Sequence, residues 1–328
     1  MKTLKSISYS EAIFEAYNYL LDNYPEFIVV GQGTWSPWYV GETMNGLEKK
    51  YGKNRVIDSP VSENATTAAA LGAALAGLKT MVVHPRMDFM ILASDAIVNQ
   101  AAKWQSMFGG GKKIPLTIRS IINRGGEQGA QHSQALHSWY AHIPGLRVAL
   151  PYSPLDARDL LISSVLCDDP VLYIDDRWCY DLVEEYKPIK ELNLLEQKPK
   201  KIKKGSDITL VGSGYSTQIC VEINKKLAKK KLSSDVFDIR IINPLNIFEI
   251  INSVKKTGNL FVIDGGWQNC GLAGEIIASV CERINSKRVI VSRFTIMDSP
   301  APSSSALEKP YYHDNDYIYK CILNKIDS

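Results

Sequence analysis

The stretch GGEQGAQHSQALHSWYAHIPGLRVALPYSP, residues 125–154, carries more information than any other part of this chain. A glycine-rich run leads into His132, which is flanked by polar residues, and a Pro-Gly turn precedes an apolar run at 146–150. Glycines let a backbone approach a ligand closely, and a histidine moves protons near neutral pH. The pattern indicates a binding or catalytic loop that leads into a strand.

On both sides of this stretch, helical and strand patterns alternate. The first half predicts helices over residues 9–23, 41–51, 64–78 and 155–167, a long helix within 89–109, and strands over 27–30, 55–58, 80–83, 114–119, 146–150 and 171–174. Ser8 is the expected cap of the first helix. Strands that alternate with helices imply a mainly parallel sheet covered on both faces.

Residues 184–206 are charged and only weakly periodic, which is typical of an interdomain connection. A second alternating pattern follows, with strands expected over 208–212, 234–240, 260–264 and 288–294 and helices over 218–230 and 274–283. We therefore expect an α/β fold with two domains. The first is a mainly parallel-sheet domain over 1–185, followed by a linker over 186–206 and a smaller α/β domain over 207–328.

Bulk properties exclude several classes of protein. A chain of 328 residues is long enough for two domains, and 45% hydrophobic with 22% charged residues is typical of a globular protein. The net charge of only +3 argues against nucleic-acid binding. Six cysteines show no zinc-type spacing, and no apolar run approaches the ~20 residues of a membrane helix. With no signal-peptide pattern at the N-terminus, we expect a cytoplasmic protein.

Three side chains follow predicted strands at the same sheet edge, where ligands of parallel sheets gather. Glu63 stands directly before a helix, and the alternative is a first-turn glutamate that complements the helix dipole. Phe89 follows the next strand, where a phenylalanine is usually a core residue. His132 follows a third strand through the glycine-bearing loop. Their grouping favours a site more than any one of them does.

The chain resembles the beta subunit of thiamine diphosphate-dependent 2-oxo acid dehydrogenases, the group of the pyruvate, branched-chain 2-oxo acid and acetoin enzymes. The likeness runs almost from end to end. Its segments include YGKNRVIDSPVSE, ALGAALAGLKTMV, SDAIVNQAAKW, GAQHSQALHSWYAHIPGL and DSPAPSSSALEKPY. The resemblance implies a transketolase-like first domain that binds the cofactor's pyrimidine and a transketolase C-terminal-type second domain.

The resemblance also implies roles for the three side chains. Glu63 matches the glutamate that hydrogen-bonds the aminopyrimidine and stabilises the tautomer that takes the thiazolium proton. Phe89 matches the aromatic residue that stacks on the pyrimidine. His132 matches a histidine near the reacting centre, implicated in proton or acyl transfer. The cofactor then serves as electron sink for decarboxylation of a 2-oxo acid.

Further residues are implicated by their positions in the family pattern. Gln32 stands where the family usually has a glutamate near the cofactor, and it keeps the hydrogen-bonding shape but not the charge. Arg86 is either a surface residue or a carboxylate or phosphate contact. The family's potassium site would use backbone oxygens around four residues together with an aspartate: Leu116, Ser164, Val165, Cys167 and Asp169.

The chain lacks the Gly-Asp-Gly…Asn-Asn motif that binds magnesium and diphosphate in the family. The resemblance therefore implies an enzyme active only with an alpha subunit, which supplies that half of the site in an α2β2 heterotetramer of two alpha and two beta subunits. Trp139, Tyr140 and the small-residue helix 65–77 are either interface or core. The acyl acceptor is a lipoyl group on an acyltransferase or a small carbonyl compound. Two alternatives remain: the C-terminal half of a split transketolase, and a non-catalytic scaffold for an alpha subunit.

Overall fold

The structure, a computed structural model, describes residues 5–284 and 289–327. Residue 288, the first of the strand expected over 288–294, lies outside the described residues, as do 1–4, 285–287 and 328 of the expected domains. Contacts divide the chain into two compact units. The first comprises the residues up to Asn123 together with Trp139–Gln197, and the second comprises Arg124–Ser138 and the residues from Lys198 onward.

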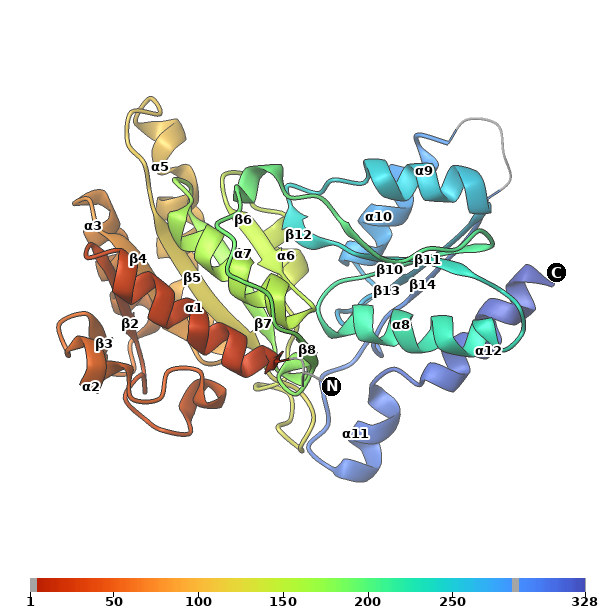
Figure 1. Cartoon of the computed structure of the whole chain (residues 1–328), viewed down its shortest axis with the longest axis horizontal. Coiled ribbons are helices and arrows are strands. Elements are labelled where there is room, and N and C mark those ends of the chain that lie inside the picture. The colour runs from red at the N-terminus through yellow and green to blue at the C-terminus, as the bar shows by residue number, and fades with distance from the viewer. Residues whose placement is uncertain (1–4, 285–288, 328) are drawn as a thin grey trace. The chain divides into compact units, whose positions relative to one another are not determined.

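The first unit is built on a parallel sheet (Figure 1). Its strands are neighbours in the order β6 (Arg147–Leu150), β7 (Val171–Asp176), β5 (Leu116–Ile122), β4 (Lys79–His84), β2 (Phe27–Gly31) and β3 (Val56–Asp58). Every residue of β5 and β7 is buried, as expected for strands covered on both faces. The α/β prediction is confirmed for this unit.

Helices α1 (Tyr9–Asn23) and α7 (Pro154–Leu166) pack against each other on this sheet (Figure 1). The predicted cap of α1 is present as a capping box, because Ser8 Oγ accepts from Glu11 N at 3.3 Å and Ser8 N donates to Glu11 Oε2 at 2.7 Å. Helix α3 (Glu63–Leu75) packs on β4. These packed helices hold the strands of the sheet in place, and with them the strand ends that carry the candidate site.

Two predicted helices are wrong in extent. Within 41–51, only α2 (Leu47–Tyr51) is α-helical, because Gly41 and Gly46 adopt positive φ angles of 64° and 73°. The long helix expected within 89–109 is broken into four short elements. These are α4 (Met87–Met90), η2 (Ile91–Ala93), the π-helix η3 (Asp95–Ala101) and α5 (Ala102–Met107).

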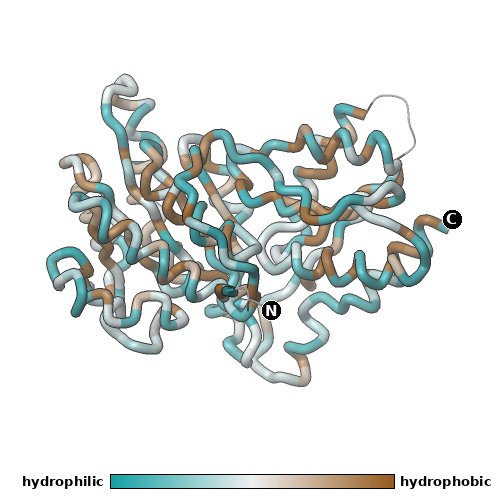
Figure 2. Tube along the Cα trace, viewed as in Figure 1, coloured by the Kyte–Doolittle hydropathy of each residue, from teal (hydrophilic) through white to brown (hydrophobic). Residues whose placement is uncertain are grey.

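The second unit has its own sheet, in the order β14 (Ile290–Phe294), β13 (Asn259–Ile263), β10 (Ile208–Gly212), β11 (Ser234–Asp238) and β9 (Lys200–Lys203). Only β9 pairs antiparallel. Figure 1 shows α9 (Phe248–Thr257) and α10 (Leu272–Cys281) on one side of the sheet and α8 (Tyr215–Ala228) and α12 (Asn315–Ile326) on the other. In Figure 2 the trace of α8 alternates between hydrophobic and hydrophilic, as expected for a helix with one buried face.

The segment expected to be a linker contains regular structure. It includes η5 (Leu194–Glu196) and β9. The strand that precedes this segment, β8 (Val183–Glu185), pairs with β1 (Ser6–Ser8). The strand expected over 234–240 ends at Asp238, and β12 (Arg240–Asn243) begins after it. Two short helices, α6 (His137–Ala141) and α11 (Ser305–Tyr311), complete the elements. No helix in the described part of the chain is long and apolar enough to cross a membrane.

Candidate active site

Three of the predicted site residues follow neighbouring strands of the first sheet. Gln32 comes directly after β2, Glu63 follows β3 through a short connection, and Phe89 follows β4. Since β2 pairs with both β3 and β4 in parallel, the three residues start from the same carboxyl edge. Ligands of open α/β sheets bind at this edge.

The turn that carries Gln32 is fixed by hydrogen bonds to the neighbouring strand. Asp58 Oδ1 accepts from Gly33 N at 2.6 Å and from Thr34 N at 3.2 Å. Gly31 has no room for a side chain, because a Cβ there would lie 2.7 Å from the backbone oxygen of Val83. The partly buried Gln32 is therefore held in one position at the strand end.

Glu63 is the first residue of α3 and is partly buried. The positive end of the helix dipole stabilises its carboxylate. One turn on, Thr67 Oγ1 lies 2.9 Å from His84 Nε2, which joins α3 to the end of β4. Burial lowers the pKa of His84 to about 4, so its ring is neutral at pH 7. His84 thus anchors the helix that presents Glu63.

Phe89 is the accessible member of α4. Its neighbours Met87, Asp88 and Met90 are buried, whereas Phe89 keeps part of its surface exposed. A partly exposed aromatic ring beside a strand end suits a flat ligand ring. The usual expectation, a phenylalanine buried in the core, therefore fits Phe89 only in part.

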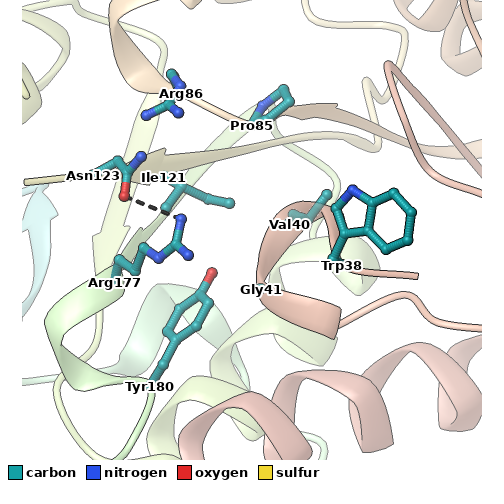
Figure 3. Close-up of a pocket in the computed structure, with 9 residues that line it drawn as sticks. All are labelled: Trp38, Val40, Gly41, Pro85, Arg86, Ile121, Asn123, Arg177 and Tyr180. Atoms are coloured by element: carbon teal, nitrogen blue, oxygen red, sulfur yellow. Dashed lines mark hydrogen bonds between the residues drawn. The ribbon is translucent and has the colours of Figure 1, made fainter. Parts of the chain in front are cut away.

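A cavity of about 80 Å³ opens at the same edge, beyond the ends of four strands. It is lined by side chains from the segment after β2 and from the ends of β4, β5 and β7: Trp38, Val40, Gly41, Pro85, Arg86, Ile121, Asn123, Arg177 and Tyr180. In Figure 3, Arg86, Asn123 and Arg177 lie on one side of the pocket and Val40 and Trp38 on the other. Arg177 Nη1 donates to Asn123 Oδ1 at 3.3 Å. Arg177 was not singled out in the sequence.

The cavity rests on a buried polar network. Arg119, with no exposed surface, donates from Nε to Asp175 Oδ2 at 3.0 Å and from Nη1 to Tyr17 and Thr43. Tyr180, which lines the cavity, donates to the same Asp175 oxygen at 2.8 Å. Burial alone would lower the pKa of Arg119, but the charge of Asp175 raises it well above its usual value. The network is therefore an ion pair that holds the Tyr180 ring in place.

His132 belongs to the second unit, unlike Glu63 and Phe89. The loop that carries it is fastened to the C-terminal part of the chain. Glu127 N donates to Glu308 Oε2 at 2.9 Å, and Ser305 N donates to Glu127 Oε1 at 2.7 Å. The structure thus brings Gln32, Glu63 and Phe89 together at one sheet edge and places His132 on a loop of the other unit.

Sequence reasoning missed a buried hydrogen-bonded pair next to this loop. His137 Nε2 donates to Asp264 Oδ1 at 2.8 Å, and both side chains are almost fully buried. Asp264 also accepts from Gly266 N at 3.0 Å and from Ala273 N at 3.2 Å. Burial raises the pKa of Asp264, but the charge of His137 and these hydrogen bonds outweigh it and lower the pKa.

Asp264 begins the sequence Asp264-Gly265-Gly266, which only weakly resembles the family's Gly-Asp-Gly motif. The glycines instead admit side chains from the His132 loop. A Cβ on Gly265 would lie 2.3 Å from Arg124 Nη1, and one on Gly266 would lie 3.1 Å from His137 Cε1. Arg124 Nη1 also donates to the Gly265 oxygen at 3.2 Å. The motif therefore anchors the loop.

The residues expected at a potassium site lie at the start of β5 and around the end of α7: Leu116, Ser164, Val165, Cys167 and Asp169. Ile114 N donates to Asp168 O at 2.8 Å, which joins the two segments. The Asp169 carboxylate already accepts from Arg147 Nε at 2.6 Å and from Gln105 Nε2 at 3.0 Å. Backbone oxygens at the helix end are the remaining donors. Among the described residues, no His, Cys, Asp and Glu side chains form a group of three or more able to hold a metal ion.

Comparison with known proteins gives consistent matches for both units. The family described as "Transketolase, pyrimidine binding domain" matches residues 5–177, and "Transketolase, C-terminal domain" matches residues 197–318. The beta subunit of acetoin:2,6-dichlorophenolindophenol oxidoreductase from Cupriavidus necator is 32% identical over 94% of this chain and 94% of its own. The mitochondrial pyruvate dehydrogenase E1 component subunit beta from Homo sapiens is 33% identical over 85% of this chain and 80% of its own.

A solved structure shares the fold. It is described as "Split gene transketolase, inactive beta4 tetramer" and superposes with a TM-score of 0.79 over 98% of both chains. Its sequence identity of 17% makes it a likeness of fold alone.

Proposed function

Because this chain belongs to the family of beta subunits of thiamine diphosphate-dependent 2-oxo acid dehydrogenases, we propose that it binds the aminopyrimidine half of the cofactor and acts in decarboxylation of a 2-oxo acid. The observation that carries the proposal is the placement of Glu63 and Phe89 at one carboxyl edge of a pyrimidine-binding-type sheet. The enzyme is an oxidoreductase that acts only with an alpha subunit.

The residues present fit the aminopyrimidine. Glu63 supplies a carboxylate at a helix start, where it would hold a proton at a ring nitrogen of the bound pyrimidine. Phe89 supplies an accessible ring for stacking, and Gln32 a neutral amide on a fixed turn. Thiamine diphosphate, when bound, supplies the carbon nucleophile and the electron sink for decarboxylation.

His132 is the proposed group for proton or acyl transfer. Its loop is fixed by the hydrogen bond from Glu127 N to Glu308 and by the buried pair of His137 and Asp264. A side chain that moves a proton needs such fixed geometry, since small displacements cost large factors in rate. We assign the loop anchors a positioning role.

The partner proposed for this chain is an alpha subunit, in a heterotetramer of two alpha and two beta subunits. The alpha subunit would bind magnesium and the diphosphate, because this sequence lacks the motif for them.

We propose that a potassium ion, where present, is held by backbone oxygens of Leu116, Ser164, Val165 and Cys167, because the Asp169 carboxylate already accepts a hydrogen bond from Arg147. A lipoyl acyltransferase is the proposed acceptor component, and the cytoplasmic location stays a prediction.

The split transketolase remains a weaker alternative. The solved structure with that description shares only the fold, at 17% identity. The dehydrogenase beta subunits are matched at 32–33% identity over most of the chain. The scaffold alternative predicts that no residue at the sheet edge matters for turnover, which mutation tests.

The test is Glu63→Ala in the complex with the alpha subunit. We expect kcat for 2-oxo acid decarboxylation to fall by roughly 10²–10⁴-fold, the usual contribution of a positioned acid–base group. Because Glu63 is only partly buried, the complex should still assemble. A matched control is Glu282→Ala, which removes an exposed carboxylate from the second unit. Full activity of Glu63→Ala would reject the role assigned to Glu63 and favour the scaffold.

A further inference from the structure

We propose that Arg86 and Arg177 form an anion-binding subsite that selects substrates carrying a second anionic group, a carboxylate or a phosphate, besides the 2-oxo acid. This inference rests on the proposed function for the identity of the reaction. The binding of an anion between the two arginines stands on the geometry of the first unit alone.

The position of the cavity points to a ligand site. Arg86 stands two residues beyond the end of β4, Asn123 directly after β5 and Arg177 directly after β7. The ends of three parallel strands thus each contribute one hydrogen-bonding side chain to the same hollow. Arg86 is also three residues before Phe89, so the segment after β4 carries a residue of each proposed site.

The lining has the charge of an anion site. Two guanidinium groups line the cavity, and none of the nine lining residues is an aspartate or glutamate. Asp175, which lies below Tyr180, is neutralised by its buried pair with Arg119. Guanidinium groups offer paired N–H donors in the geometry that carboxylate and phosphate oxygens require.

The amide of Asn123 orients one of the two cations. Its Oδ1 accepts from Arg177 Nη1 at 3.3 Å, and Asn123 is 5% exposed whereas Arg177 is an exposed residue (Figure 3). A buried amide therefore fixes the direction of a guanidinium that still reaches solvent. The other N–H groups of Arg177 are available to a ligand entering from outside.

The volume of the cavity limits what it holds. About 80 Å³ is several times the roughly 10–15 Å³ that one water molecule needs on the same measure. A carboxylate or a phosphate group fits in this space. The exposed indole of Trp38 lies at its rim.

The walls of the cavity are built rigidly. Gly41 approaches the Tyr180 ring so closely that a Cβ would lie 2.2 Å from Tyr180 Cε2. Its neighbours Val40 and Glu42 both adopt left-handed φ angles, 56° and 62°. Strained backbone of this kind persists only where the surroundings enforce it and is concentrated at functional sites.

The first experiment uses the full chain alone and inorganic phosphate or succinate as the probe. Calorimetric titration should detect binding of the probe to the natural chain. Arg177→Gln and Arg86→Gln should each weaken it about tenfold or more, the effect of losing one charge-assisted hydrogen bond. Arg283→Gln, which removes an exposed cation from the second unit, should leave the affinity unchanged. Absence of binding, or equal binding by all four proteins, would overturn the proposal.

The second experiment uses the complex with the alpha subunit and three substrates: pyruvate, 2-oxoglutarate and 3-phosphohydroxypyruvate. The ratio of kcat/KM for an anion-bearing substrate to that for pyruvate should fall about tenfold in Arg177→Gln. The substrate whose ratio falls identifies carboxylate or phosphate as the natural group. An unchanged ratio would overturn the selectivity, and a loss of thiamine diphosphate affinity would assign the arginines to the cofactor instead.

The two experiments separate the two claims. A complex inactive on all 2-oxo acids, together with arginine-dependent phosphate binding, would reject the proposed function and retain the anion site. Arg177→Lys guards against misfolding as a cause, because it keeps the charge at an exposed position. It should recover part of the affinity for the anion.

Discussion

His84 is a single residue whose burial makes the first unit sensitive to pH. The folded chain holds His84 with a pKa of about 4, against 6.5 when unfolded. Between these values the unfolded state binds more protons, so stability falls as pH drops from about 6.5 to about 4. The difference corresponds to about 3 kcal/mol. The natural chain should therefore lose about 3 kcal/mol more of unfolding free energy between pH 7 and pH 4 than His84→Gln does.

Urea unfolding at a series of pH values measures this difference. Gln keeps a hydrogen-bond partner for Thr67 and removes the titration. His142→Gln, at an exposed histidine, is the matched control and should follow the natural chain. Identical pH profiles for His84→Gln and the natural chain would show that His84 is not the group responsible.

We expect the hydrogen bond between Asp264 and His137 to keep the His132 loop ordered. Leaving a buried hydrogen-bonding group without its partner typically costs about 1–3 kcal/mol. Asp264→Asn should therefore destabilise the second unit by about 1–3 kcal/mol and increase amide hydrogen exchange across residues 124–138. Asp298→Asn, at an exposed carboxylate of the same unit, should do neither. Unchanged exchange in the loop would remove the positioning role.

For single residues, the sequence predicts which side chains belong to the site better than it predicts which residues they contact. The strand-end positions of Glu63 and Phe89 are readable because a short apolar run precedes each of them. The pairing of His137 with Asp264 is not, since 127 positions separate the two residues. Arg177 likewise can be assigned to the cavity only when β4, β5 and β7 are known to be neighbours.

Among the elements, the segment η1 (Tyr39–Glu42) that borders the cavity depends on glycine. Gly41→Ala would force a Cβ to within 2.2 Å of Tyr180 at a φ of +64°. Strain and overpacking together predict a loss of about 2–4 kcal/mol. Gly46→Ala has a φ of +73° and open space, so about 1 kcal/mol is expected. Denaturant unfolding compares the two, and equal losses would contradict the contact with Tyr180.

Elements with strong periodicity and caps were predicted correctly, and irregular ones were not. Ser8 and Glu11, which form the capping box of helix α1, predict where this helix begins. The π-helix η3 widens the turn, so a search for 3.6-residue periodicity joins it to its neighbours. Helix α12 had a usable signal that was overlooked, because Asp314 caps it by accepting from Asp316 N at 2.8 Å.

For the whole molecule, the alternation of strands and helices was enough to predict two α/β units. It was not enough to assign residues 124–138, which follow β5 and include the first two residues of α6 but make their contacts within the second unit. Hydrogen bonds to Asp264, Glu308 and Tyr312 create this assignment, and none of them has a local signal. The expected domain boundaries at 185 and 207 stay a prediction.

The central claim is that this chain holds half of a thiamine diphosphate site and requires an alpha subunit for the other half. Calorimetric titration with thiamine diphosphate and magnesium tests it most directly, applied to this chain, to the alpha subunit and to the co-expressed pair. We expect binding by the pair, with one cofactor for each pair of chains, and none by either chain alone. A well-formed pair that binds no cofactor, or full binding by either chain alone, would contradict the account.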